Sequence, residues 1–102
     1  MKPVKLGIIG WGPRARGLVL NILQTGASHL FEISAVADMH PVKLNQAREQ
    51  LDLPEASFYS DHHQLIEDPD VEAVLVETGA QVMAPICCDA LNAGKHVCAD
   101  VP

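Results

Sequence analysis

The sequence contains few basic residues, few cysteines and no long apolar segment. Seven Lys and Arg stand against thirteen Asp and Glu in 102 residues, which gives a net charge of −6. This charge offers no basic footprint for a phosphate backbone or an anionic lipid surface. No apolar run approaches the roughly 20 residues that a membrane helix needs. We therefore expect neither nucleic acid nor a membrane among the partners.

The three cysteines, Cys87, Cys88 and Cys98, do not indicate a disulfide framework. Their number is odd, and the start of the chain lacks the long apolar region and small-residue cleavage site of a secretory signal. The adjacent pair also misses the C-x-x-C spacing of redox and zinc sites. We expect a cytoplasmic protein with reduced thiols, in which Cys87 belongs to the core.

Apolar segments alternate between strand-like and helix-like periods, which is typical of βαβ units in a parallel sheet. At 48% hydrophobic residues, the chain has enough for one domain but is too short for two. Strands are expected at residues 4–9, 31–37, 58–59, 71–77 and 96–99. Helices are expected from 13 to the Thr25-Gly26 pair, from 41 to about 51, from an Asp61 cap to 67, and from about 82 to Gly94. This order predicts an α/β fold, a Rossmann-type doubly wound parallel sheet in three α/β/α layers.

Apolar spacing also predicts which surfaces are buried. The first strand is apolar enough to be buried on both faces, as central parallel strands are. The first helix carries apolar residues at i, i+3, i+4, i+7 and i+8, namely Ala15, Leu18, Val19, Ile22 and Leu23. The last helix is expected to turn Ile86, Cys87, Ala90 and Leu91 inward.

The five expected strands are one fewer than a complete dinucleotide-binding sheet usually has. An exposed parallel edge invites pairing, so another chain or a further part of a longer protein is expected beside the fifth strand. We interpret residues 1–102 as one dinucleotide-binding domain, truncated after its fifth strand and without its C-terminal substrate domain.

A G-x-G-x-x-A motif occupies residues 10–15, between the first expected strand and helix. Gly10 permits a tight turn, Gly12 lets backbone approach a pyrophosphate, and Ala15 lets the helix pack closely on the strand. The helix N-terminus then directs unpaired N–H groups at the phosphates. The alternative is a tight strand-to-helix turn without a ligand. The candidate phosphate-binding residues are Gly10, Trp11, Gly12, Pro13, Arg14 and Ala15.

Three side chains of this region have two interpretations each. Trp11 is placed to flank the phosphate or nicotinamide pocket, or it packs against a neighbouring loop. Arg14 and Arg16 lend charge to the pyrophosphate, or their stems lie along the surface of the domain.

Asp38 follows the second expected strand, 26 positions beyond Gly12. A carboxylate there accepts hydrogen bonds from the adenosine ribose and repels a 2′-phosphate. Met39 and His40 follow it, rather than Arg or Lys, so NAD is expected and NADP less so. The alternatives are a solvated acid in a turn for Asp38 and, for His40, a loop histidine with no contact to the ribose or adenine.

We assign no metal from the sequence. The pair His62-His63 suggests ligands, but adjacent helical residues point about 100° apart and lack i, i+4 geometry. No G-x-S-x-G motif frames any serine as a nucleophile.

Four motifs in order resemble the glucose-fructose oxidoreductase/inositol dehydrogenase/MocA (Gfo/Idh/MocA) family over essentially the whole chain. They are Gly7-Ile8-Ile9-Gly10-Trp11-Gly12, Val36-Ala37-Asp38, Asp68-Pro69-Asp70-Val71-Glu72-Ala73-Val74 and Ala93-Gly94-Lys95-His96-Val97. The resemblance implies an NAD(P)-dependent, two-domain enzyme acting on a sugar or polyol. In it, the second domain supplies much of the substrate site and the oligomer interface, so a homo-oligomer is expected.

The chain departs from the family pattern at two places. The family's Glu-Lys-Pro matches residues 100–102, Asp-Val-Pro, and Val101 cannot exchange a proton as the lysine does. The family's Thr-Pro-Asn matches residues 78–80, where Thr78 alone survives, followed by Gly79. The resemblance places Thr78, Gly79 and Asp100 by the reactive end of the cofactor. Asp100 is the weak catalytic candidate, or a strand-end acid.

These observations leave several functions open. The first is the NAD-binding domain of a sugar or polyol oxidoreductase, catalytically incomplete by itself. The resemblance also offers a glycosidase that uses bound NAD for transient oxidation, since some branches of the family carry Val-Pro at this point. A non-catalytic nucleotide-binding module and an S-adenosylmethionine site share the same fold.

Overall fold

The computed structural model describes residues 3–24 and 30–99. In this part of the chain, five parallel strands pair in the order β3-β2-β1-β4-β5. The strands are β1 Val4–Ile9, β2 Phe31–Ala37, β3 Ser57–Tyr59, β4 Ala73–Val76 and β5 His96–Ala99. The helices are α1 Pro13–Gln24, α2 Pro41–Leu51, α3 His62–Glu67 and α4 Ala80–Asn92.

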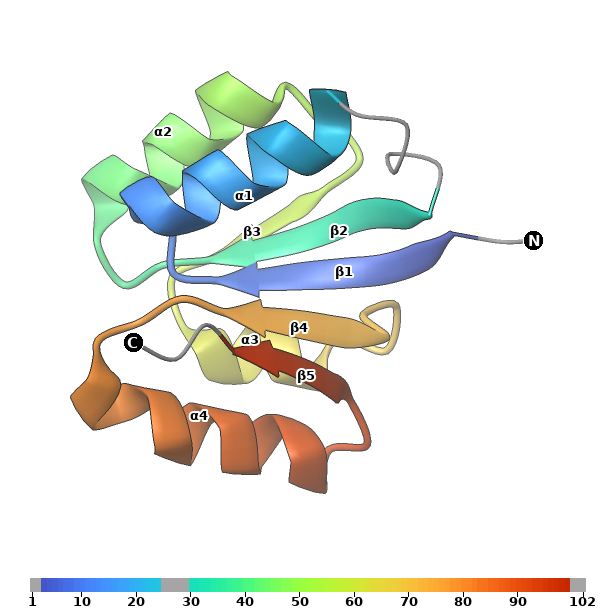
Figure 1. The fold of residues 1–102 in the computed structure, drawn as a ribbon, viewed down its shortest axis with the longest axis vertical. Coiled ribbons are helices and arrows are strands. Elements are labelled where there is room, and N and C mark those ends of the chain that lie inside the picture. The colour runs from blue at the N-terminus through green and yellow to red at the C-terminus, as the bar shows by residue number, and fades with distance from the viewer. Residues whose placement is uncertain (1–2, 25–29, 100–102) are drawn as a thin grey trace.

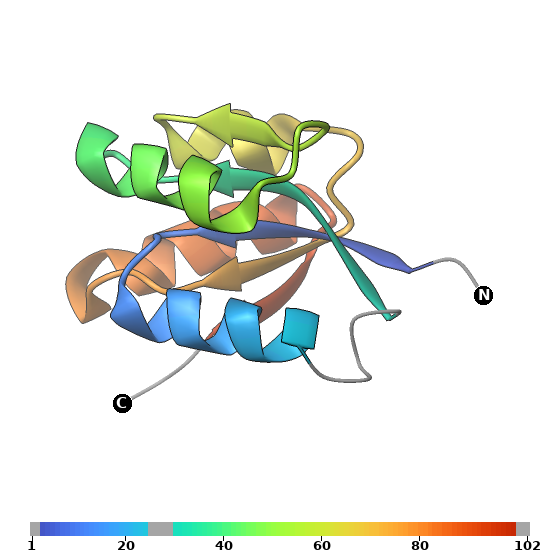
Figure 2. The same cartoon turned by 90° about the horizontal axis from the view of Figure 1, so that it is seen from above.

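Helices cover both faces of the sheet. Figure 1 shows α1 and α2 together on one face and α3 and α4 on the other, and Figure 2 gives the same arrangement from above. The chain runs from β1 outward to β3 and then returns across β1 to β4, so the strand order reverses between β1 and β4. The predicted three-layer Rossmann-type fold is confirmed, and the reversal is the place where such folds bind ligands.

The alternation of side chains along the strands divides the core in two. Ile8 and Val36 face α1 and α2, whereas Ile9, Ala35 and Ala37 face α3 and α4. The α1/α2 core also contains Trp11, Ala15, Val19, Ile33, Leu44, Ala47 and Leu51. The α3/α4 core also contains Leu65, Ile66, Val71, Val74, Val76, Met83, Ile86 and Ala90. Each helical layer is therefore held by its own apolar cluster.

Several expected boundaries agree with the structure. The bounds of β1, β2, α2 and β5 are those expected, and Asp61 caps α3 because its Oδ1 accepts a hydrogen bond from the His63 backbone N–H at 2.9 Å. The last helix begins two residues earlier than expected, and β4 is shorter than 71–77. Its ladder with β1 starts only at the Leu6–Ala73 pair.

Three burial expectations are wrong. Val4, at the start of β1, is 36% exposed, Leu18 is 40% exposed and Leu91 is 61% exposed. In α4 the inward face is set by Ile86 and Ala90, and Leu91 follows Ala90 by one residue, which turns it about 100° away. The side chains of Ile22 and Leu23, and the Thr25-Gly26 pair, lie outside the described residues.

Candidate functional site

A cavity of about 520 Å³ lies at the carboxyl ends of the strands. Four loops line it, each leaving a strand of the sheet: residues 10–12 after β1, 38–40 after β2, 60–62 after β3 and 77–79 after β4. The first two loops lead to α1 and α2 and the last two to α3 and α4, so the cavity spans the two faces of the sheet (Figure 1).

None of the described helices combines the length and apolarity of a membrane crossing.

Gly10 makes the turn that ends β1. Its φ is +92°, and an added Cβ would lie 2.5 Å from the backbone oxygen of Glu77. The Gly10 N–H donates to the oxygen of Ala37 at 2.8 Å. A residue without a side chain is thus required where three strand ends meet.

Gly12 leaves open space in front of α1. Apart from its two chain neighbours, no described residue has an atom within 4 Å of the Cβ that a substitution would add there. The helix begins at Pro13, and Ala15 is fully buried against the sheet. The first N–H groups of a helix have no partner within it, so they face a region that a phosphate can enter. Arg14 and Arg16 lie on the exposed surface of this helix.

Asp38 is 8% exposed and connects two of the loops. Its Oδ2 accepts a hydrogen bond from the Trp11 backbone N–H, and its Oδ1 accepts one from the His40 backbone N–H, both at 2.8 Å. The interpretation as a solvated turn acid is therefore wrong. An ionised carboxylate offers about four acceptor sites, so two bonds leave capacity toward the cavity that Asp38 lines.

Trp11 contributes to the site through its backbone. Its side chain is 2% exposed and belongs to the α1/α2 core, where Nε1 donates to Gln50 Oε1 at 3.0 Å. The structure thus supports packing of the indole, here against α2, rather than a position beside the nicotinamide. Gln50 was not predicted as its partner.

Thr78 and Gly79 form the wall on the α3/α4 side. Thr78 Oγ1 is buried and has no hydrogen-bond partner among the described residues. Gly79 precedes α4 in an extended conformation, and nothing lies within 4 Å of the Cβ that a substitution would add. A buried hydroxyl without a partner costs free energy, so it marks a place where a ligand group fits. Asp100 lies outside the described residues.

Several cavity residues had not been identified from the sequence. Lys43 lies in the first turn of α2, and Val82 and Ile86 come from α4. Ser60, Asp61 and His62 follow β3. The rule that ligands bind beyond the carboxyl ends of the strands would have found this last group once β3 was placed.

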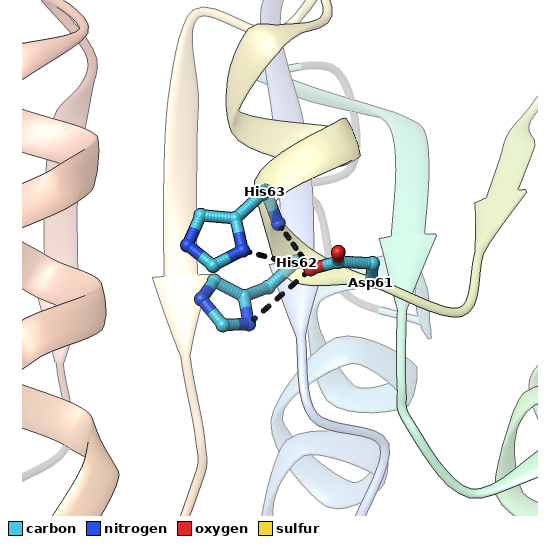
Figure 3. A group of neighbouring side chains, drawn as sticks. All are labelled: Asp61, His62 and His63. Carbon is cyan, nitrogen blue, oxygen red and sulfur yellow. Dashed lines mark hydrogen bonds and ion pairs between the residues drawn. The ribbon is translucent and has the colours of Figure 1, made fainter.

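Asp61, His62 and His63 converge at the start of α3 (Figure 3). Asp61 Oδ1 lies 3.0 Å from His63 Nδ1 and 3.9 Å from His62 Nδ1, and the two ring centroids are 4.1 Å apart. The angular spacing of adjacent helical residues did not anticipate this convergence, and the assignment of no metal stays a prediction. Both histidines occupy the first turn, where their rings rotate back toward the capping carboxylate.

Burial and hydrogen bonding shift the pKa values of this group. The pKa of His62 is lowered, mainly because its burial disfavours the charged ring and also because His63 is adjacent. The pKa of Asp61 is lowered by the His63 backbone N–H and then by the His63 side chain. A neutral His62 and a charged Asp61 are thus favoured near neutral pH.

All three cysteine thiols are free. Cys87 is half-buried and packs against the α3/α4 core, and burial raises the pKa of its thiol. Cys88 and Cys98 are exposed. The reduced state of the cysteines stays a prediction.

Comparison with known proteins identifies relatives of this chain. Residues 4–102 match the Gfo/Idh/MocA model, described as an oxidoreductase family with an NAD-binding Rossmann fold. An inositol 2-dehydrogenase/D-chiro-inositol 3-dehydrogenase from Lactiplantibacillus plantarum is 33% identical over 96% of this chain and 27% of its own length.

Two solved structures extend this similarity. Myo-inositol dehydrogenase from Lactobacillus casei, solved with NAD(H) and myo-inositol, superimposes with a TM-score of 0.86 at 28% identity, over 98% of this chain and 29% of its own. A variant 3-ketoreductase from Actinomadura kijaniata, solved with TDP-benzene and NADP, gives 0.85 at 31% identity, over 99% and 30%. The chain thus spans less than a third of the length of these relatives.

Proposed function

The chain belongs to the Gfo/Idh/MocA oxidoreductase family with its NAD-binding Rossmann fold, and on that premise we propose that its cavity binds NAD within a sugar or polyol dehydrogenase. The observation that carries the proposal is the bond between Asp38 Oδ2 and the Trp11 backbone N–H. This hydrogen bond joins the proposed ribose-binding carboxylate directly to the proposed phosphate-binding loop. The substrate class comes from the inositol-oxidising relatives, which are longer than this chain.

The residues present fit such a cofactor. The open space at Gly12 and the N-terminus of α1 would receive the pyrophosphate. The remaining acceptor sites of Asp38 would bind the adenosine ribose hydroxyls. The Thr78 hydroxyl, which has no partner among the residues that the structure describes, would contact the other half of the dinucleotide. When bound, the nicotinamide supplies hydride chemistry, whereas this chain orients it and excludes water.

The proposed preference for NAD over NADP depends on Asp38. Its carboxylate would repel a 2′-phosphate, while Lys43 on the same cavity would attract one. We expect calorimetric titration to give NAD an affinity at least about tenfold above that of NADP. Asp38→Ser should narrow this ratio, and the matched Lys43→Gln should widen it by weakening NADP alone. An unchanged ratio in Asp38→Ser would remove this role of the carboxylate.

Catalysis is proposed to require residues beyond this chain. Val101 stands where the family has its proton-exchanging lysine, so the proton-exchanging group would have to come from residues beyond Pro102. Residues 1–102 alone should therefore bind NAD but not reduce it with any inositol or sugar, whereas a longer protein that contains them should do so, measured by NADH absorbance across a panel of inositols and sugars. Turnover by residues 1–102 alone would contradict the proposal. We also propose that the protein forms a homo-oligomer and is located in the cytoplasm.

The same Val101 favours one second candidate, a glycosidase that uses NAD for transient oxidation. Such an enzyme releases a sugar from a glycoside without net formation of NADH. A panel of chromogenic glycosides in the assay of the longer protein separates the two, because only the dehydrogenase accumulates NADH. Binding of S-adenosylmethionine in place of NAD in the titration would reject both.

A further inference from the structure

We propose that Asp61, His62 and His63 bind one divalent transition-metal ion at the rim of the cofactor cavity. Asp61 and His62 line that cavity, and His63 lies beside them on the outer surface. Figure 3 shows both imidazole rings directed at the same carboxylate oxygen. The site is separate from the proposed NAD contacts, which come from the loops after β1, β2 and β4.

The positions of the donor atoms suit a single ion. One nitrogen from each histidine and one oxygen of Asp61 all lie within 4.8 Å of one another. In a tetrahedral site, ligand atoms about 2.0–2.2 Å from a zinc ion are separated from one another by roughly 3.3–3.6 Å. The separation of Asp61 Oδ1 from His63 Nδ1, 3.0 Å, is slightly shorter than this, and that from His62 Nδ1, 3.9 Å, is slightly longer. Small rotations of the two rings would bring both separations into the range.

Asp89 of α4 supplies the second carboxylate that metal-binding histidines usually have. Its Oδ2 lies 3.4 Å from His63 Nε2, on the side of the ring away from Asp61. If this carboxylate holds the ring proton on Nε2, the lone pair is on Nδ1, where the ion would lie. Asp89 is therefore a positioning residue, and the site would connect α3 to α4.

The donor set selects the class of ion. Two imidazole nitrogens and one carboxylate favour Zn²⁺, Co²⁺ or Ni²⁺ over Mg²⁺ and Ca²⁺, which prefer oxygen ligands. Three protein ligands leave at least one coordination position of the ion open. Because Asp61 and His62 lie on the cavity wall, this position would be accessible from the cavity.

The test is titration of the chelator-treated protein, without a histidine tag and without NAD, with ZnCl₂ by calorimetry and with CoCl₂ by visible absorption. We expect one Zn²⁺ per chain and cobalt d–d bands. His62→Gln and His63→Gln should each weaken Zn²⁺ binding by more than about a hundredfold, and Asp89→Asn by about tenfold. The matched control is His96→Gln, which removes an exposed histidine of β5 and should change nothing.

Circular dichroism confirms that each variant is folded, and Asp61→Asn, which also weakens the cap of α3, is used only in addition to the histidine variants. Absence of saturable Zn²⁺ binding in the parent overturns the proposal, and so does a loss confined to one histidine. In either case the close contacts are those of a histidine–carboxylate ion pair alone. The titration contains no dinucleotide, so its failure leaves the proposed NAD function intact.

Discussion

The two sides of the cavity differ in how completely their polar groups are paired. On the α1/α2 side, both oxygens of Asp38 accept backbone hydrogen bonds, and the Trp11 indole donates to Gln50. On the α3/α4 side, the Thr78 hydroxyl is buried and has no hydrogen-bond partner in the described part of the chain, and burial lowers the pKa of His62. The first side is thus organised by the chain itself, whereas the second retains groups that a ligand would stabilise. Removal of the Asp38 carboxylate should therefore lower stability as well as binding, whereas removal of the Thr78 hydroxyl should lower binding alone.

The largest expected effect is that of Gly10→Ala. The new Cβ would lie 2.5 Å from the Glu77 oxygen, at a φ of +92° that alanine disfavours. We expect the free energy of unfolding to fall by about 3 kcal/mol or more, from backbone strain and displacement of the strand end. Urea denaturation followed by circular dichroism measures it.

Gly12→Ala is the control for this prediction and lies only two residues away. Its Cβ meets no atom within 4 Å, so the free energy of unfolding should change by no more than about 0.5 kcal/mol. NAD affinity should nevertheless fall at least about tenfold, because the methyl group occupies the space of the pyrophosphate. Equal losses of stability in both variants would show that the two glycines do not have separate roles.

Asp38→Ala should have the next largest effect. Removal of the carboxylate leaves the Trp11 and His40 backbone N–H groups without their acceptor, which costs about 1–3 kcal/mol of unfolding free energy. NAD binding should weaken as well, because the ribose acceptor is lost. If Asp38→Ala were as stable as the parent, the hydrogen bonds of Asp38 would contribute nothing measurable to stability. The proposed difference between the two sides of the cavity would then be wrong.

The fold was largely predictable because its signals are local. Periodic apolar runs, Gly10 and the Pro41 helix start determine β1, β2 and α2 within their own segments. The errors fell on helix faces such as those of Leu18 and Leu91. There, one position of rotation decides burial, and only the packed sheet fixes it.

The site was predictable where one motif contains its own partners. The loop at Gly10 and the acid Asp38 obey a known spacing, and both reached the cavity. Gln50 and Lys43 were missed because their role depends on how α2 lies on the sheet. The convergence of His62 and His63 on Asp61 was missed for a similar reason, since rotamers at a helix start do not follow from an average angular spacing.

Thr78→Val tests the α3/α4 side with a smaller expected change. The substitution removes a buried hydroxyl that has no partner within residues 3–24 and 30–99, and it keeps the shape of the side chain. The free energy of unfolding without ligand should stay the same or rise by up to about 1 kcal/mol, while NAD affinity falls. Thr78→Ser, which keeps the hydroxyl, should bind NAD as the parent does. A marked loss of stability in Thr78→Val would mean that the hydroxyl is paired within the protein.

The smallest expected effect is the pH dependence contributed by His62. Its pKa in the folded protein lies below the ordinary value of 6.5, so the unfolded chain binds the proton first as the pH falls. The free energy of unfolding should therefore decrease as the pH falls through and below about 6.5. The contribution of Asp61, whose pKa is also lowered, is lost only below its ordinary 3.8, which separates the two windows. Denaturation series across this range should show a shallower slope for His62→Gln than for the parent or the exposed control His96→Gln. Identical slopes in all three would mean that the ring is as well hydrated in the folded state as in the unfolded chain, and that burial on the α3/α4 side costs it nothing.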